Sequence, residues 1–203
     1  TAATIQAFID AGYTQSEGGL KAYIAAGHGD EELWRGLEWT RAIDALVAQT
    51  MRDVPPFPLA RESLQKLYGK TDMMVISTTA SDALKREWGE YDLERYVDLL
   101  AGQDMGVKRQ IFATAARPHY PADRIIMLGD APADREAARS IGALFYPTLP
   151  GMEELSWQRF HDDAIDRFLS GTYAGAYEDA LNAEFDALLS DTPPWQTAEA
   201  ARR

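Results

Sequence analysis

Short apolar runs alternate with longer helix-like segments between residues 59 and 147, and this alternation restricts the possible folds more than any other feature. The helix-like segments cover roughly 59–68, 81–88, 107–116 and 133–140. The apolar runs have the length of strands and lie at residues 72–77, 96–101, 124–129 and 143–146. Strands that alternate with helices at intervals of about 20 to 27 residues predict an α/β fold, with a parallel sheet covered by helices on both faces.

The segments on either side of this alternation predict helices, so we divide the chain into three stretches. Residues 1–53 are expected to form a helical domain, residues 54–150 the α/β core, and residues 151–203 a C-terminal helical extension with a tail. The proline-rich VPPFP string reads as a linker between the first two stretches. The helices expected within 152–189 leave two alternatives open, because their apolar faces suit either the core or a second copy of the chain in a homodimer.

The N-terminal stretch carries specific helix signals. Ile5, Phe8 and Ile9 lie on one helical face, and a glycine shortly after them is expected to end that helix. Ser16 and Asp30 are suitable N-caps for a second and a third helix. At the other end of the chain, the DTPPW string is expected to end the ordered part.

Composition excludes several classes of function. The 203-residue chain has 20 basic and 32 acidic side chains, a net charge of −12, so we expect neither nucleic acid nor an anionic membrane as a partner. No apolar stretch reaches the roughly 18 residues that a membrane-spanning helix needs. The absence of cysteine excludes disulfides and thiol catalysis, and it fits a cytoplasmic protein. Because the chain begins with Thr1 rather than Met, we expect that further residues precede it in the translated protein.

Two carboxylates follow the third apolar run, at the point where a strand is expected to end. Asp130 comes directly after Gly129, and Asp134 lies about one helical turn later. Both side chains suit capping of a helix N-terminus. They also suit Mg²⁺, which takes one or two carboxylates and completes its shell with water and substrate phosphate. Ligand sites of parallel sheets lie beyond the carboxyl ends of the strands, so this turn is a candidate metal site.

Polar side chains also follow the first two apolar runs. Ser77 ends the first run and Thr78 follows it, so this segment either caps the next helix or cradles a phosphate with hydroxyl and backbone N–H groups. Lys108 begins a helix, where a cation opposes the helix dipole. It is either a solvated lysine or a group that neutralises charge during phosphoryl transfer.

With these motifs in this order, residues 4 to 147 or so resemble the haloacid dehalogenase (HAD) superfamily of phosphohydrolases, in the branch with a helical cap. The MMVIS string ending at Ser77 resembles the family's second motif, Lys108 the third, and MLGDAPAD, with Asp130 and Asp134, the fourth. The helical residues 1–53 resemble the cap, and AGHGDEEL around His28 resembles its substrate-facing loop. The resemblance implies a Rossmannoid sheet.

The resemblance also implies a mechanism for a small phosphorylated substrate. An aspartate attacks the phosphorus to form an aspartyl-phosphate, and a second acid protonates the leaving group and then activates water. Mg²⁺ is held at Asp130, with Asp134 orienting its shell. Ser77 and Thr78 bind the phosphoryl group, Lys108 balances its charge, and His28 faces the substrate.

The family's first motif, Asp-x-Asp-x-Thr after a strand, does not occur in this chain. The nearest string, FIDAGYT, offers Asp10 but has Gly12 where the second acid belongs, and its apolar residues fit a helix better than a strand. We therefore expect the nucleophile's strand upstream of Thr1. A degenerate motif at Asp10 and a catalytically inactive protein are the alternatives.

Three other functions compete with the phosphohydrolase. A dehalogenase needs no metal, but Asp130 and Asp134 would repel its anionic substrate unless a cation intervened. A phosphonate-cleaving enzyme would need an amine in the cap, where Lys21 is the only lysine. A non-catalytic HAD-like protein that binds a ligand or partner belongs to a different class, and resemblance of fold alone does not exclude it.

Overall fold

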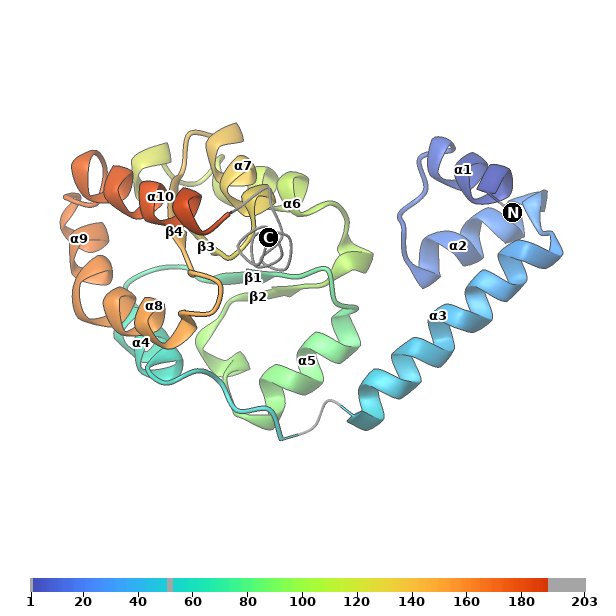
Figure 1. The fold of residues 1–203 in the computed structure, drawn as a ribbon, viewed down its shortest axis with the longest axis horizontal. Helices are drawn as coiled ribbons and strands as arrows, with labels where there is room; N and C mark the ends of the chain where they lie inside the picture. Colours follow the sequence, from blue (N-terminus) through green and yellow to red (C-terminus); the bar gives the residue numbers. More distant parts are fainter. Residues whose placement is uncertain (1, 51–52, 190–203) are drawn as a thin grey trace, which may run out of the picture. The chain divides into compact units, whose positions relative to one another are not determined.

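The computed structural model describes residues 2–50 and 53–189 as a mixed α/β protein with two small parallel sheets (Figure 1). The described chain divides into two compact units. The first unit holds the N-terminal helices and Tyr68–Phe112, and the second holds Phe57–Leu67 and the chain from Ala113 onward. The DTPPW string lies outside the described residues.

The N-terminal helices of the first unit form where the sequence predicts them. Ser16 caps α2 by accepting a hydrogen bond from the backbone N–H of Gly19, and Asp30 accepts one from Leu33 at the start of α3. The helices are α1 (Ala2–Asp10), α2 (Glu17–Tyr23), the π-helical turn η1 (Ile24–His28) and α3 (Glu31–Thr50). Their buried side chains form one apolar cluster of Phe8, Leu20, Tyr23, Ile24, Leu33 and Leu37.

The rest of the first unit is a parallel strand pair with its helices. Strand β1 (Met74–Ile76) lies beside β2 (Leu99–Ala101), and Val75 is in register with Leu100. The turns η2 (Glu94–Tyr96) and η3 (Gln103–Met105) flank β2, α5 (Ser81–Glu90) connects the two strands, and α6 (Lys108–Ala116) follows them. The strands are shorter than the apolar runs 72–77 and 96–101 from which we predicted them.

The second unit contains the other strand pair. Strand β3 (Ile126–Gly129) is parallel to β4 (Leu144–Pro147), and Met127 is in register with Phe145. Helix α7 contacts both strands, and α10 contacts β4 (Figure 1). The helical elements of this unit are α4 (Ala60–Leu67), η4 (Ala122–Arg124), α7 (Pro132–Ser140), α8 (Glu153–Arg159), the π-helical turn η5 (Phe160–Ala164), α9 (Ile165–Ser170) and α10 (Ala176–Leu188).

The four strands do not form the single sheet that the alternation predicts. Among the described residues, β1 pairs only with β2, and β3 only with β4. A strand needs hydrogen-bonded partners to extend a sheet, and the described strands form two separate pairs.

Among the described residues, the outer edges of β1 and β3 carry no further strand. The N–H of Ser77 donates to Ala101, and the carbonyl of Gly129 accepts from Thr148. The backbone N–H and C=O groups of alternate residues in β1 and β3 therefore point toward the partner strand. The backbone groups of the intervening residues point away from the partner strand. These residues are Met74 and Ile76 in β1, and Ile126 and Leu128 in β3.

The outer edge of β4 is closed by side chains of the C-terminal extension. Glu178 accepts a hydrogen bond from the backbone N–H of Phe145, and the Tyr173 hydroxyl donates to the Phe145 carbonyl. All four residues of β4 are buried. Of the two alternatives for the extension, packing on its own chain is therefore confirmed for these helices.

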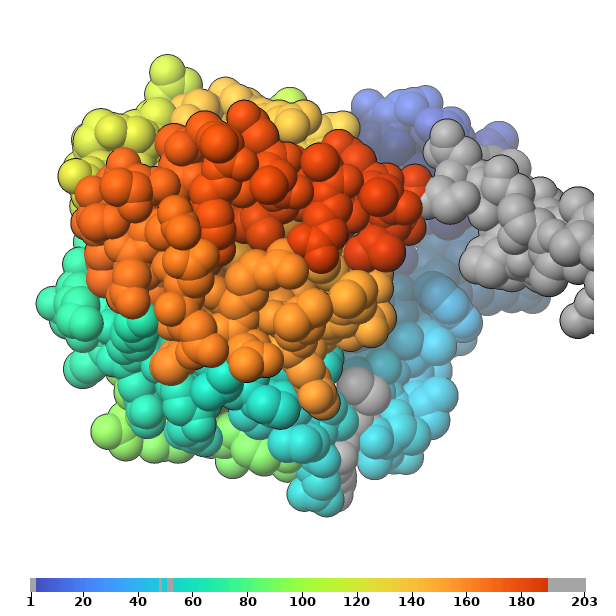
Figure 2. All heavy atoms as spheres, turned by 60° about the vertical axis from the view of Figure 1, so that its left-hand side comes forward, coloured from blue at the N-terminus to red at the C-terminus, as the bar shows by residue number. Residues whose placement is uncertain are grey.

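Helix α4 packs on the same extension. Lys66 forms a 2.9 Å ion pair with Asp166 and donates a 2.7 Å hydrogen bond to the carbonyl of His161. Figure 2 shows the atoms of α4, in teal, continuous with those of α8 and α9, in orange. Helix α4 therefore belongs to the second unit. Within the described ranges, no helix is both long and apolar enough to cross a membrane.

Candidate functional site

The predicted site residues lie in both units, which we describe separately. His28, Ser77, Thr78 and Lys108 belong to the first unit. Asp130 and Asp134 belong to the second.

Ser77 occupies the predicted position at the carboxyl end of β1. Its backbone N–H donates to the Ala101 carbonyl at 2.9 Å, which extends the pairing of β1 with β2 by one residue. Its hydroxyl oxygen accepts a 3.1 Å hydrogen bond from the backbone N–H of Thr79. The hydroxyl can still donate its proton, so Ser77 and the backbone of Thr78 can present donors to an anion beyond the strand.

The start of α5 is capped by Asp104, a residue that we did not predict from the sequence. Its two carboxylate oxygens accept hydrogen bonds from the backbone N–H of Ser81 at 2.8 Å and from the Ser81 hydroxyl at 2.9 Å. These two bonds hold the pKa of the Asp104 carboxyl below its usual range. Ala80, at the N-cap position itself, makes no side-chain hydrogen bond. The prediction that the Ser77–Thr78 segment caps this helix is therefore wrong, because the Ser77 hydroxyl bonds to Thr79 and the cap comes from the loop after β2.

Lys108 is the first residue of α6, as predicted, and lies on the same loop four residues after Asp104. Its side chain is half-buried. A second hydrogen bond ties this loop to the Ser77 turn, because the Gln103 N–H donates to the Thr79 carbonyl at 3.0 Å. The structure therefore joins the segment of Ser77 and the segment of Lys108 within one unit.

Asp130 and Asp134 lie on the turn between β3 and α7. Asp134 is only 4% exposed, and its carboxylate accepts a 3.3 Å hydrogen bond from the backbone N–H of Ala131. A Cβ added to Gly129 would lie 2.4 Å from the Asp134 side chain, so only glycine fits at the end of this strand. Asp130 is exposed. Asp134 thus holds the turn from inside, and Asp130 presents a carboxylate outside it.

These carboxylates fit Mg²⁺ in part. Asp130 offers an exposed oxygen donor, whereas the buried Asp134 is better placed to fix the turn than to bind an ion directly. Among the described residues, no three His, Asp or Glu side chains are grouped so that they could hold a metal. Mg²⁺ often takes only one or two carboxylates and keeps several waters, so Asp130 could serve as one ligand of a larger set.

The remaining predicted positions lie on the N-terminal helices. His28 is exposed, and its ring stacks on that of Tyr23 with centroids 4.4 Å apart. Asp10 is the last residue of α1 and accepts a hydrogen bond from Gln6 within that helix. Asp10 is therefore not at the end of a strand, and the degenerate first motif loses its structural basis.

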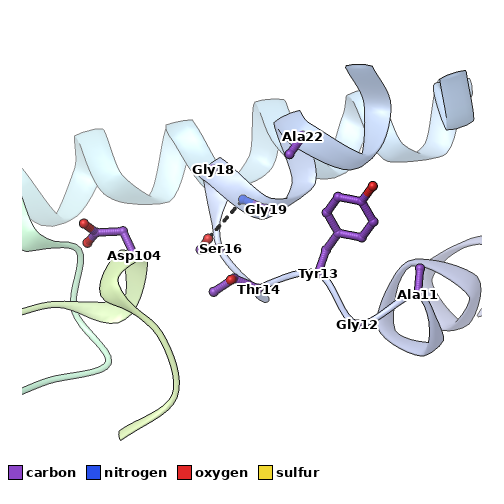
Figure 3. Close-up of a pocket in the computed structure, with 9 residues that line it drawn as sticks. All are labelled: Ala11, Gly12, Tyr13, Thr14, Ser16, Gly18, Gly19, Ala22 and Asp104. Carbon is purple, nitrogen blue, oxygen red and sulfur yellow. Dashed lines mark hydrogen bonds between the residues drawn. The ribbon is translucent and has the colours of Figure 1, made fainter. Parts of the chain in front are cut away.

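A pocket of about 530 Å³ lies beside the loop between α1 and α2. It is lined by Ala11, Gly12, Tyr13, Thr14, Ser16, Gly18, Gly19, Ala22 and Asp104 (Figure 3). Gly19 is required here, because a Cβ would lie 1.8 Å from the Thr14 carbonyl oxygen. Tyr13, Thr14 and Ser16, which carry hydroxyl groups, are among the lining residues, and we did not predict this pocket.

Comparison of the chain with protein-family models, with curated proteins and with solved structures gives no match.

Proposed function

We propose that this chain is the larger part of a Mg²⁺-dependent phosphohydrolase of the HAD type, which acts on a small phosphorylated metabolite. The observation that carries the proposal is that the described strands form two separate parallel pairs, together with the polar residues that follow β1 and β3. Ser77 follows β1 and Asp130 follows β3, and among the described residues the outer edges of both strands carry no further strand.

One further parallel strand, pairing with both edges, would complete a five-stranded sheet. Parallel strands are normally paired and buried on both sides, whereas all three residues of β1 and three of the four residues of β3 are only half-buried. The carboxyl end of the added strand would then come next to Ser77 and next to Asp130. A carboxylate at this end would be placed to attack a phosphoryl group bound there.

The side chains of this chain would divide the work around that nucleophile. Ser77 and Thr78 would bind phosphoryl oxygens, and Lys108 would offset the negative charge that develops during transfer. Asp130 would hold Mg²⁺, which supplies charge neutralisation at the phosphate when bound. Asp134 would keep the Asp130 turn in place through Ala131. The nucleophile itself would come from residues that precede Thr1 in a longer gene product.

The test is the gene product that includes the residues before Thr1. If they encode an apolar strand ending in Asp-x-Asp, we expect Mg²⁺-dependent hydrolysis of p-nitrophenyl phosphate, and none from residues 1–203 alone. Turnover by the 203-residue chain itself would contradict the proposal, because the nucleophile would then lie within this chain, with Asp10 as its first candidate.

The metal assignment has its own test. Mg²⁺ should raise the melting temperature, and Asp130→Asn should remove most of that rise because the ion needs the charge. Asp123→Asn, an equal charge change at an exposed position of the same unit, is the matched control. An equal rise in Asp130→Asn and in the wild type would exclude Asp130 as a ligand.

A non-catalytic, partner-binding protein is the second candidate, because α3 has an uncovered apolar face. Trp39, Ile43 and Leu46 lie on one side of this helix and are 67%, 39% and 54% exposed. Exposed tryptophan is typical of protein interfaces. Binding of Mg²⁺ without turnover by the longer gene product would favour this candidate over the enzyme.

A further inference from the structure

Asp104 connects the two segments that carry the predicted phosphate-binding and charge-balancing residues. Both of its carboxylate oxygens accept hydrogen bonds from Ser81, 23 residues earlier in the chain. Ser81 begins α5 four residues after Ser77, and Lys108 begins α6 four residues after Asp104. The contact therefore lies between the turn of Ser77 and the turn of Lys108.

The Ser77 turn is held at both of its ends. At one end, Ser77 donates to Ala101 in β2, and at the other Ser81 donates twice to Asp104. Between them, the Thr79 carbonyl accepts from Gln103. A short segment with three such attachments has few alternative conformations, so the Ser77 hydroxyl keeps one position.

The loop after β2 also lies close against Ser81. A Cβ on Gly102 would lie 2.4 Å from the Ser81 nitrogen, so only glycine allows this approach. The Asp104 carboxylate also places a negative charge at the N-terminus of α5, which the helix dipole favours. The same charge keeps a phosphate away from Ser81 and leaves Ser77 and Thr78 as the donors for it.

We infer that Asp104 is a positioning residue, which fixes the Ser77 turn against the Lys108 loop and so directs a phosphoryl group to Ser77 and Thr78. We call the two hydrogen bonds between Asp104 and Ser81 the clamp. The ligand in this inference rests on the proposed function, whereas the clamp consists of contacts observed in this chain. The two parts can therefore be tested separately.

The first measurement is amide hydrogen exchange in the 203-residue chain. Asp104→Ala removes both acceptors, and we expect exchange at Ser81 to become at least about tenfold faster, since charge-assisted hydrogen bonds are the strong ones. Asp104→Asn keeps one acceptor and should show a smaller increase. Asp82→Asn, an exposed acid in the first turn of α5, is the matched control and should change exchange at Ser81 by less than about twofold. Equal exchange in Asp104→Ala and the control would overturn the clamp.

The second measurement uses inorganic phosphate and the longer gene product. Asp104→Ala should weaken phosphate binding, followed by the amide shifts of Ser77 and Thr78, by about tenfold. It should raise KM more than it lowers kcat, and Asp104→Asn should restore part of the loss. Unchanged phosphate affinity alongside faster exchange would overturn the positioning role. Wild-type protein that neither binds phosphate nor turns over substrate would instead overturn the proposed function, and the exchange result would still decide the clamp.

Discussion

The Glu178 carboxylate in α10 accepts a 2.9 Å hydrogen bond from the backbone N–H of Phe145 in β4, 33 residues earlier in the chain. The Tyr173 hydroxyl donates to the carbonyl of the same residue at 2.8 Å. The next outward-facing residue of β4, Pro147, has no N–H to satisfy. These features close the outer edge of β4, which would otherwise be open to pairing with another chain.

Replacing Glu178 should show what this closure contributes. Glu178→Leu leaves the Phe145 N–H without its acceptor, so the free energy of unfolding should fall by about 1–3 kcal/mol. Glu178→Gln keeps a carbonyl acceptor and should cost much less. Urea unfolding measures both, with Asp179→Asn as an exposed control on the neighbouring residue. Equal losses in the Leu and Gln variants would mean that the hydrogen bond contributes little.

The pH dependence of stability provides a second test of Glu178. Burial raises the pKa of this carboxyl, and the Phe145 N–H opposes the shift only in part. The folded state therefore binds the proton more tightly than the unfolded state. The stability from this group is fully present below the ordinary glutamate pKa and is lost as pH rises through the raised folded value. Wild-type protein should lose this increment on that rise, whereas Glu178→Gln should not. A parallel pH dependence in the two proteins would contradict the assignment.

Tyr173→Phe removes the second contact to Phe145 without changing the packed volume. Tyr173 is fully buried, and its hydroxyl is the donor to the Phe145 carbonyl. The loss should lower the free energy of unfolding by about 1 kcal/mol. Tyr120→Phe, at a 39% exposed position, is the matched control and should have a smaller effect. A neutral Tyr173→Phe would show that water replaces the hydroxyl at the carbonyl.

The helices and their caps were more predictable than the site. Ser16 and Asp30 bond to backbone groups three residues away, so local sequence is enough to identify them. Asp104 acts on Ser81 across 23 residues from a single 3₁₀ turn, which leaves no periodic signal in the sequence. The hydrogen bond from Phe145 to Glu178 likewise joins residues far apart in the chain, 33 positions, and leaves no local signal in the sequence. Three of the four strands are shorter than the predicted runs, and β4 is only shifted by one residue, because strand length depends on the partner and not only on the apolar run.

Lys108→Ala tests the charge-balancing role in the longer gene product. Removing a cation beside the transferring phosphoryl group should reduce kcat by at least about tenfold. Arg109→Ala removes the same charge from the next residue, which is exposed, and should leave kcat nearly unchanged. Similar effects of the two substitutions would indicate a general electrostatic contribution and not a specific role for Lys108.

The outer edges of β1 and β3 give the most direct test of the proposed additional strand. In β3, the N–H groups of Ile126 and Leu128 point away from β4, whereas that of Met127 points toward it. In β1, the N–H groups of Met74 and Ile76 point away from β2, whereas that of Val75 points toward it. In the 203-residue chain, the outward amides should exchange with solvent faster than Met127 and Val75, which serve as internal controls. Adding the residues before Thr1 should slow the outward amides by at least about tenfold and leave the controls nearly unchanged, because a paired strand protects only the groups that face it. Two results would rule out the proposed strand. One is that Ile126 and Leu128 are as protected as Met127 before the addition, and the other is that their protection does not change after it. The pattern of amide exchange depends only on backbone pairing. It therefore tests whether the sheet is completed, independently of any catalytic activity.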